Sequence, residues 1–381
     1  MPSANILITC PKACSKYLAA ELESLGYAVT KEAPAGVFTT GTLEDCIRLN
    51  LQLRTGLRVL WQVANFRARN AEALYRRASK LPWTDWIPAD GYFSIVSSIR
   101  NDTIRNTGFA NLKLKDAIVD KIRKETGRRP DTGNDSDKAS VFLYWKEEDV
   151  YLYLDTSGKP ISNRGYRVSP WKAPMRENLA ASVIDATRWD KQSPFINPMC
   201  GSGTLAIEAA LLAKKQTPNL LRDNFAFMHL VDYKPWDYAQ LRTELSNTSI
   251  EASSPRIIAT DSDPAAIEAA QRNAEIAGVA DLIDFKVCDF LDTEIPPDPG
   301  TIILNPEYGE RLGEEEALME TYQKIGDLFK QRAPGYWGYV FTGNMNLGKR
   351  VGLKTKRKIE FYNGPIECRL LEYELYAGSK R

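Results

Sequence analysis

The stretch Pro194-Phe195-Ile196-Asn197-Pro198-Met199-Cys200-Gly201-Ser202-Gly203-Thr204-Leu205-Ala206-Ile207-Glu208 decides the fold of this 381-residue chain. A short apolar run, Phe195-Ile196, breaks at Asn197-Pro198 into a glycine-rich turn, and an amphipathic segment follows. Strand, glycine turn and helix in this order begin a doubly wound α/β sheet, which holds its ligand at the carboxyl ends of the strands. The turn therefore predicts a nucleotide-like ligand, because glycines let the backbone approach closely and the helix N-terminus offers free N–H groups.

Two alternatives stay open on this stretch alone. Gly201-x-Gly203-x-x-Ala206 also satisfies the fingerprint of dinucleotide-binding proteins, and a glycine-rich turn is often only a turn. A second stretch is therefore needed to separate these interpretations.

That second stretch is Thr301-Ile302-Ile303-Leu304-Asn305-Pro306-Glu307-Tyr308-Gly309-Glu310-Arg311, a buried-type strand that ends on Asn-Pro-x-Tyr. It resembles the S-adenosylmethionine-dependent nucleic-acid methyltransferases that modify exocyclic amines. Together with Asn-Pro-x-Cys-Gly-Ser-Gly-Thr at 197–204, it is similar to the ribosomal large-subunit guanine-N2 methyltransferases that carry a THUMP domain. The resemblance covers nearly the whole chain and implies S-adenosylmethionine as cofactor, S-adenosylhomocysteine as product, and no metal.

The C-terminal half alternates strands and helices as this resemblance requires. Strands are expected at 256–261, 282–287, 301–304 and 336–342, and a helix at 264–277 ends before Gly278. Segments 358–362 and 367–376 predict a hairpin that turns at Asn363-Gly364. A parallel sheet that ends in such a hairpin is similar to the seven-stranded class I methyltransferase sheet, and it does not suit a plain dinucleotide-binding fold. Residues 216–255 interrupt the alternation as an insertion.

The expected cofactor residues follow the strand ends. An acidic residue after the second strand suits ribose hydroxyls, since a carboxylate only accepts hydrogen bonds, and Asp261 stands there. Asp263 is the alternative, although Pro264 after it favours helix N-capping. Asp289 is assigned to the adenine amine, or alternatively to capping the next turn. With the resemblance, the cofactor set is Arg176, Asn197, Pro198, Cys200, Gly201, Ser202, Gly203, Thr204, Asp261, Ser262, Asp289 and Phe290.

Asn305, Pro306 and Tyr308 are the expected catalytic residues. An exocyclic amine is a weak nucleophile because its lone pair is delocalised into the ring. Carbonyl oxygens of Asn305 and Pro306 can accept its N–H bonds, orient the lone pair and stabilise the growing positive charge. Tyr308 offers a flat face for an extruded base. Asn197 replaces the usual Asp, and Glu307 replaces the second Pro of Asn-Pro-Pro-Tyr; this carboxylate could contact a guanine N–H edge.

The N-terminal part predicts RNA binding. Residues 1–165 carry 24 Lys and Arg against 19 Asp and Glu, whereas the remainder carries 26 against 30. We expect a ferredoxin-like α+β subdomain at 1–65, a THUMP-like domain at 66–160 and the methyltransferase domain at 161–381. An amphipathic helix at 107–123 presents a basic face. A solvated surface would explain each basic cluster singly, and the resemblance favours RNA contacts by Arg76, Arg77, Lys113, Lys115, Arg128 and Arg129.

Composition excludes several classes of protein. The cysteines show no metal-binding pairs, and His229 is the single histidine, which argues against a zinc site or a histidine-dependent mechanism. The chain has no long apolar run and opens with no secretory signal, so a reduced, cytoplasmic protein without membrane contact is expected.

The expected function is methyl transfer to a guanine N2 amine of 23S rRNA, in free RNA or in a ribosome-assembly intermediate, with no obligate protein partner. Three alternatives keep the fold: a tRNA guanine-N2 methyltransferase, an N6-adenine methyltransferase, and an inactive RNA-binding protein. A nicotinamide-dependent oxidoreductase is the remaining alternative, and the Asn-Pro-x-Tyr strand end counts against it.

Overall fold

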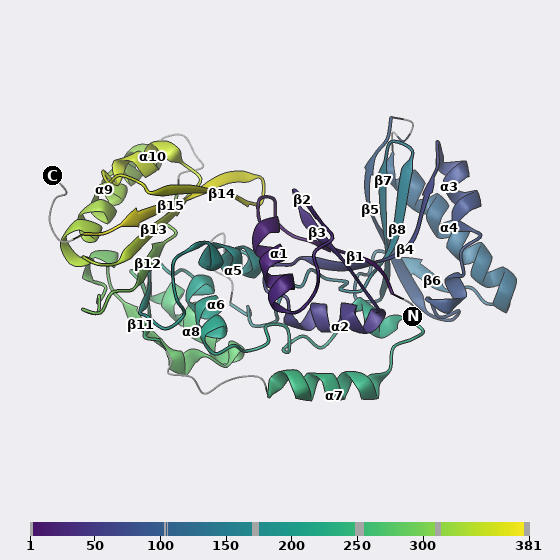
Figure 1. Cartoon of the computed structure of the whole chain (residues 1–381), viewed down its shortest axis with the longest axis horizontal. Coiled ribbons are helices and arrows are strands. Elements are labelled where there is room, and N and C mark those ends of the chain that lie inside the picture. Colours follow the sequence, from purple (N-terminus) through teal and green to yellow (C-terminus); the bar gives the residue numbers. More distant parts are fainter. Residues whose placement is uncertain are drawn as a thin grey trace. The chain divides into compact units, whose positions relative to one another are not determined.

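A computed structural model describes residues 3–102, 104, 106–169, 175–247, 255–308 and 314–376 (Figure 1). By its internal contacts the chain divides into two compact units. The first contains residues 1–10, 19–161 and 222–245, and the second contains residues 11–18, 162–221 and 246–381. Most of the insertion expected at 216–255 therefore belongs to the first unit.

The first unit carries an eight-stranded sheet in the order β2-β3-β1-β4-β8-β7-β5-β6. Its elements are α1 (Ser15–Ser24, shared with the second unit), β1 (Ala4–Thr9), β2 (Lys31–Ala33), β3 (Gly36–Gly41), α2 (Leu43–Gln52), β4 (Arg58–Arg67), α3 (Ala71–Ala78), η1 (Trp83–Asp85), β5 (Tyr92–Arg100), α4 (Thr107–Thr126), β6 (Asp131–Gly133), β7 (Ala139–Lys146), β8 (Asp149–Asp155), η2 (Ala226–His229) and α7 (Pro235–Ser246).

One long strand makes this sheet continuous. β4 pairs with β1 through Arg58 to Trp61 and with β8 from Leu60 to Arg67. The boundary expected at 65/66 lies inside β4, so the ferredoxin-like and THUMP-like parts share a sheet. The helix expected at 107–123 is α4, which buries Leu114, Ile118 and Ile122 and presents its charged residues outward.

The second unit carries a seven-stranded sheet in the order β11-β10-β9-β12-β13-β15-β14. Its elements are α5 (Glu177–Ala186), β9 (Phe195–Pro198), α6 (Thr204–Ala213), β10 (Ile257–Asp261), α8 (Pro264–Ala277), η3 (Ala280–Leu282), β11 (Ile283–Val287), η4 (Phe290–Asp292), β12 (Thr301–Leu304), α9 (Glu314–Arg332), β13 (Trp337–Thr342), α10 (Met345–Arg350), β14 (Arg357–Asn363) and β15 (Ile366–Glu374). β9 to β13 are parallel, and β15 and β14 run antiparallel, which confirms the expected class I arrangement.

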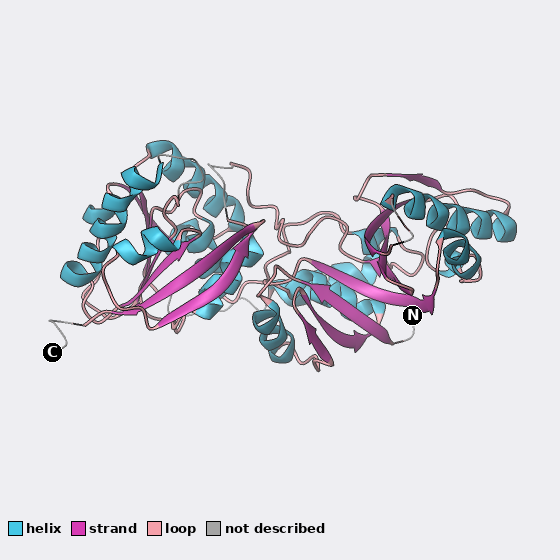
Figure 2. Ribbon diagram, turned by 90° about the horizontal axis from the view of Figure 1, so that it is seen from above, coloured by secondary structure: helices cyan, strands magenta, loops and turns pink. Residues whose placement is uncertain are grey.

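The switch point of this sheet lies at β9. Phe195 pairs with Ile257 of β10 on one side and with Thr301 of β12 on the other. Figure 1 shows α9 on one side of the strands and α5, α6 and α8 on the other, and Figure 2 shows helices flanking the twisted sheet. Strand order reverses between β9 and β12, so their carboxyl ends flank the crevice where such sheets bind ligands.

α6 differs from the amphipathic helix that its sequence predicts. Every residue from Thr204 to Leu212 is buried, because α6 contacts both α5 and α8 as well as strands of the sheet. A helix that is covered all round needs no polar face. Its one acidic residue, Glu208, is fully buried and is discussed below with its ion-pair partner.

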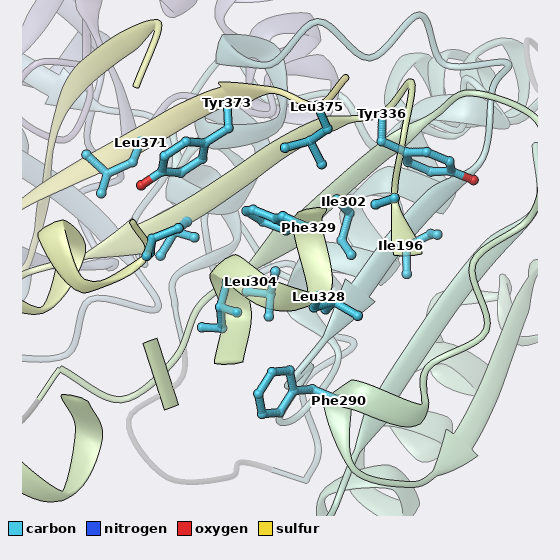
Figure 3. Close-up of a cluster of buried hydrophobic side chains, with 14 of the residues drawn as sticks. Ile196, Phe290, Ile302, Leu304, Leu328, Phe329, Tyr336, Leu371, Tyr373 and Leu375 are labelled. Carbon is cyan, nitrogen blue, oxygen red and sulfur yellow. The ribbon is translucent and has the colours of Figure 1, made fainter. Parts of the chain in front are cut away.

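The core beside α9 anchors the strands that carry the site. Figure 3 shows Ile196 of β9, Ile302 and Leu304 of β12, and Phe329 of α9 within one buried cluster. These strands are buried on both faces, so their apolar runs are nearly continuous, as in other parallel sheets.

The terminal hairpin turns one residue later than expected. Asn363 pairs with Ile366, which places Gly364 and Pro365 in the two-residue loop. Gly364 has φ +62°. Pro365 cannot adopt a positive φ, which excludes the type I′ turn expected of Asn-Gly and suits a turn with glycine first.

Among the described residues, no helix has both the length and the apolar character required to cross a membrane.

Candidate active site

The carboxyl ends of β9, β10 and β12 converge on a cavity of about 360 Å³. This lies within the range of roughly 300–1,000 Å³ that is usual for small-molecule sites. The residues assigned from the sequence that line it are Asn197, Cys200, Gly201, Ser202, Thr204, Asp261, Ser262, Asn305 and Pro306. The structure thus brings three segments, spread over more than 100 residues of the chain, to one hollow.

The glycine-rich loop holds a conformation that its sequence permits. Gly201 and Gly203 have φ +55° and +80°, and Met199 between them and β9 has φ +56°. Gly203 begins α6, and a Cβ there would lie 2.9 Å from Cβ of Ala270 on α8. Gly203 is therefore required for helix packing as well as for the turn, because both the positive φ and the close contact exclude a side chain.

Asp261 links β10 to the glycine-rich loop. Its Oδ2 accepts a hydrogen bond from Gly201 N at 3.0 Å, and its Oδ1 accepts one from Asp263 N at 3.0 Å. A carboxylate has about four lone-pair sites, so acceptor capacity remains at the cavity. Asp263 accepts from Ala265 N at 2.9 Å and is the N-cap of α8, which confirms the capping role expected for it.

The contacts of Asn197 explain why an amide stands where the motif usually has Asp. Its Nδ2 donates to the carbonyl oxygen of Ile303 at 3.0 Å and so ties β9 to β12. An ionised carboxylate has no proton to donate to a carbonyl. The buried Oδ1 of Asn197 accepts no hydrogen bond from any residue described in the structure.

Asn305 presents an unused acceptor directly after β12. Its Oδ1 is shielded from solvent and lacks a hydrogen-bond donor among the described residues. A buried polar atom without a partner costs about 1–3 kcal/mol, so its persistence needs a reason. The loop behind it is held by Tyr322 of α9, whose hydroxyl donates to the Glu307 carbonyl at 3.3 Å.

Tyr308 lies beside the cavity and does not line it. Its hydroxyl accepts a hydrogen bond from Asn363 Nδ2 at 3.0 Å, and a Cβ on Gly343 would lie 3.0 Å from its ring. The ring is half-buried against β13 and the hairpin. The residues that follow in the motif, 309–313, fall outside the described residues.

Five other residues assigned to the cofactor do not line the cavity. Pro198 is buried as the last residue of β9, and Gly203 begins α6. Arg176 is the exposed N-cap of α5. Asp289 accepts from Leu291 N at 2.9 Å, which is the capping alternative stated for it. Phe290 packs in the hydrophobic cluster of Figure 3 beside Leu328, because the turn after β11 points its ring into the core.

The stretch 157–174, whose turn-like sequence suits a joint between the domains, supports the cavity wall through its described residues. Arg167 donates to Glu177 at 3.0 Å, to the Met175 carbonyl at 2.9 Å and to the Ser202 hydroxyl at 3.4 Å. Asn273 of α8 accepts from the backbone of residues 168 and 169 and donates to the Ser202 carbonyl at 3.2 Å. Residues 170–174 of this joint lie outside the described residues. In the sequence, only the closely spaced Arg and Tyr residues at 164–167 indicated that this stretch contributes to the site.

The same segment carries a buried ion pair. Arg164 donates to both carboxylate oxygens of Glu208, at 2.7 and 2.8 Å, and the Tyr166 hydroxyl donates to Glu208 at 3.0 Å. Arg164 and Glu208 are fully buried, and Tyr166 is nearly so. This pair fixes the segment to α6, directly after the glycine-rich loop.

Cys200 is not a nucleophile in this arrangement. Burial, and then the nearby Asp261 carboxylate, raises the pKa of its thiol well above the ordinary value. A neutral thiol is a weak nucleophile.

A second hollow of about 580 Å³ lies in the first unit at the start of α3. Its charged lining residues are Arg67, Arg69, Arg76, Arg77, Lys80 and Glu148. Arg76 and Arg77 thus line the hollow together with Arg67, Arg69 and Lys80, which were not among the RNA contacts expected from the sequence.

The other expected RNA contacts lie outside this hollow. Lys113 pairs with Glu72 at 2.5 Å, Lys115 with Asp116 at 4.0 Å, and Arg128 with Asp90 at 3.2 Å. Arg129 is exposed after α4.

Comparison with known proteins agrees with this geometry. The family described as RMKL-like, methyltransferase domain, matches residues 164–372. The RlmL ferredoxin-like domain matches residues 5–60, and the THUMP domain matches residues 68–155.

Several whole proteins are similar to the chain. Ribosomal RNA large subunit methyltransferase K/L of Pseudomonas paraeruginosa (strain DSM 24068 / PA7) is 36% identical over 96% of this chain and 52% of its own. The chain thus spans about half the length of the curated relatives it matches.

Two solved structures match it end to end. SMU.472, complexed with SAH, has a TM-score of 0.89 at 26% identity and covers 100% of both chains. A predicted N6-adenine-specific DNA methylase from Listeria monocytogenes str. 4b F2365 has a TM-score of 0.89 at 30% identity and covers 99% and 97%. With its matched domains, sheet order and cavity, the chain belongs to the RMKL-like methyltransferase family.

Proposed function

We propose that this protein transfers a methyl group from S-adenosylmethionine to the N2 amine of a guanine in large-subunit ribosomal RNA. The observation that carries the proposal is Asn305, which lines the same cavity as Asp261 and the glycine-rich loop and whose shielded Oδ1 has no donor in the described structure. An acceptor at Asn305 would lie beside the groups expected for the cofactor, which supports its proposed role in orienting the amine.

The cavity fits the proposed cofactor by its donor and acceptor set. Asp261 keeps lone pairs for ribose hydroxyls, and Cys200 to Thr204 form the close backbone approach before α6. Met175 and Leu318 add apolar walls. When bound, S-adenosylmethionine supplies an electrophilic methyl group on a positively charged sulfur. A solved relative, SMU.472, is described as complexed with SAH, the product expected of this chemistry.

The protein's own contribution is to orient and polarise the amine. Asn305 Oδ1 would accept one N–H of the amine, and the Pro306 carbonyl the other. Both interactions strengthen as positive charge grows on nitrogen, so they stabilise the transition state more than the ground state. The half-buried ring of Tyr308 would stack on the extruded base, and its bond to Asn363 keeps the ring in place.

RNA is the proposed partner. The curated relatives are named ribosomal RNA large subunit methyltransferases, and THUMP matches the middle of the first unit. Five cations around one hollow suit a phosphate backbone, whose binding depends on such charges. The finer target, 23S rRNA or a ribosome-assembly intermediate, rests on the relatives' names, and a cytoplasmic location follows from that target. The proposal also keeps three domains: a ferredoxin-like subdomain at 1–65, a THUMP-like domain at 66–160 and a methyltransferase domain at 161–381.

An N6-adenine methyltransferase is the second candidate. The Listeria monocytogenes relative carries that description, and Asn-Pro-x-Tyr serves any exocyclic amine. The two candidates differ only in which base enters the site.

Mass-spectrometric mapping of rRNA and tRNA, from cells with and without the protein, tests the proposal. We expect one N2-methylguanine of large-subunit rRNA to disappear and to return with the wild-type chain. An unchanged rRNA, or loss of a methyladenine or a tRNA modification instead, would reject the guanine-in-rRNA assignment.

A further inference from the structure

We propose that Glu307 makes the site selective for guanine, by accepting the ring N1–H beside the amine that is methylated. This inference rests on the function proposed above. Glu307 lines the cavity together with Asn305 and Pro306, and its side chain is exposed there. It stands where related motifs carry a second proline.

The backbone of Glu307 is fixed by Tyr322, a residue that does not itself line the cavity. Its carbonyl accepts a hydrogen bond from the Tyr322 hydroxyl at 3.3 Å, and that hydroxyl also bonds the Thr342 hydroxyl at 2.9 Å. Tyr322 is fully buried in α9. With its carbonyl anchored in this way, the exposed Glu307 lines the cavity two residues after Asn305, whose Oδ1 is unpaired among the described residues.

The carboxylate has no ion-pair partner within the part of the chain that the structure describes. An unpaired carboxylate is a pure acceptor with several lone-pair sites. Asn305 and Glu307 line the same cavity two residues apart, and each carries an unpaired acceptor; a base edge with two adjacent donors would suit this pair.

Only one nucleobase with an exocyclic amine offers that edge. In guanine the N2 amine adjoins a ring N–H, whereas the amines of adenine and cytosine adjoin a ring nitrogen with a lone pair. With the amine held at Asn305, that lone pair would face the Glu307 carboxylate and repel it. Leaving such a group unpaired rejects the wrong substrate, by about 10⁴-fold in fully buried sites.

The test replaces the target guanine by 2-aminopurine, which keeps the N2 amine and lacks the N1–H. Single-turnover methylation is measured on a transcript spanning the mapped nucleotide, with guanine or 2-aminopurine at that position. We expect the wild-type protein to prefer guanine by at least about 10²-fold, a value reduced from the buried limit by the exposure of Glu307.

Two variants and a matched control complete the test. Glu307→Gln, whose amide can donate to the lone pair of 2-aminopurine, should lose most of this preference. Glu307→Asp should still prefer guanine over 2-aminopurine, because a carboxylate acceptor remains. Glu275→Gln, at an exposed glutamate of α8 that does not line the cavity, should behave as wild type.

The outcomes separate the two proposals. A wild-type protein that methylates neither transcript, while another base is modified in cells, refutes the proposed function. A wild-type protein that methylates guanine and 2-aminopurine equally overturns the role of Glu307, and so does Glu307→Gln with an unchanged preference.

Discussion

Two asparagines at neighbouring strand ends show how the same side chain takes two roles. Asn197 Nδ2 donates to the Ile303 carbonyl, so its amide holds β9 against β12. Asn305 follows β12 and opens on the cavity with its acceptor unused. Both asparagines line the cavity with an unpaired Oδ1, so what separates them is the amide of Asn197, which is bound to β12, and the Asn-Pro-x-Tyr motif, which Asn305 opens.

Asn305→Ala should lower the single-turnover methylation rate by about 10²–10³-fold, as for loss of one preorganised partner of a charge that develops in the transition state. Cofactor affinity, measured by calorimetry, should stay near wild type. Asn346→Ala, at an exposed asparagine of α10, is the control and should leave both quantities unchanged. A near wild-type rate for Asn305→Ala would remove the central claim.

Asp261→Ala should weaken cofactor binding by about 1–3 kcal/mol, because ribose hydroxyls and the Gly201 N–H lose their acceptor. Asp263→Ala should act mainly on stability, by about 0.5–2 kcal/mol, since it removes the N-cap of α8. Titration calorimetry and urea unfolding of both variants check this. Greater loss of cofactor affinity in Asp263→Ala would reverse the assignment.

At the scale of elements, α6 joins the site to the rest of the second unit. It begins at Gly203, it is covered on all sides, and its buried Glu208 holds Arg164 and Tyr166. Through Arg167, the same segment reaches Ser202 in the glycine-rich loop. The loop is thus held both directly at Ser202 and through α6, which follows it.

Glu208→Gln should destabilise the protein by about 3–5 kcal/mol, because it leaves the buried Arg164 guanidinium without its counter-charge. Urea unfolding followed by fluorescence measures the effect. Replacing both partners, Arg164→Met with Glu208→Leu, should cost less than Glu208→Gln alone, since no charge stays buried. Equal stability of Glu208→Gln and wild type would contradict the role of the pair.

At the scale of the whole chain, an N-terminal segment completes the second unit. Residues 11–18 belong to the second unit, where Cys14 and Leu18 are fully buried. Tyr17 stacks on Phe361 of β14 with ring centroids 5.6 Å apart, and Lys12 lies 4.0 Å from the Tyr362 ring centre. A catalytic fragment that starts at residue 161 lacks these partners.

We therefore expect the fragment 161–381 to be less stable than the same fragment with residues 11–18 joined through a flexible linker. Each buried apolar side chain that the shorter fragment lacks removes roughly 1.5–3 kcal/mol. Thermal unfolding of the two fragments measures the difference. Identical melting temperatures would show that the segment adds nothing to the second unit.

The basic hollow predicts a salt-dependent contribution to RNA affinity. Arg76→Gln with Arg77→Gln should weaken binding of structured rRNA and lower the slope of log affinity against log salt by about 1 for each phosphate that is no longer neutralised. Lys330→Gln, at a lysine of α9 paired with Asp327, serves as the control. An unchanged slope in the double variant would place the RNA elsewhere.

Local signals were sufficient for much of the fold. Apolar runs, Gly278 after α8, the N-cap at Asp263 and the glycines before α6 act within a few residues of chain, so their outcomes follow from sequence. The two motifs also predicted which strand ends meet, because parallel strands that flank a switch point share one edge of the sheet.

The tertiary structure decided what depends on distant neighbours. In the folded chain Phe290 lies in the core, Tyr308 lies against Gly343, and α6 is covered on all sides. Residues 11–18 belong to the second unit and residues 222–245 to the first, although their neighbours in sequence belong to the other unit. Burial and pairing are properties of what surrounds a side chain, and those surroundings come from segments that are distant in the chain. The unpaired Oδ1 of Asn305 is of this kind: sequence placed the residue at a strand end, and only packing showed that no described neighbour donates to it.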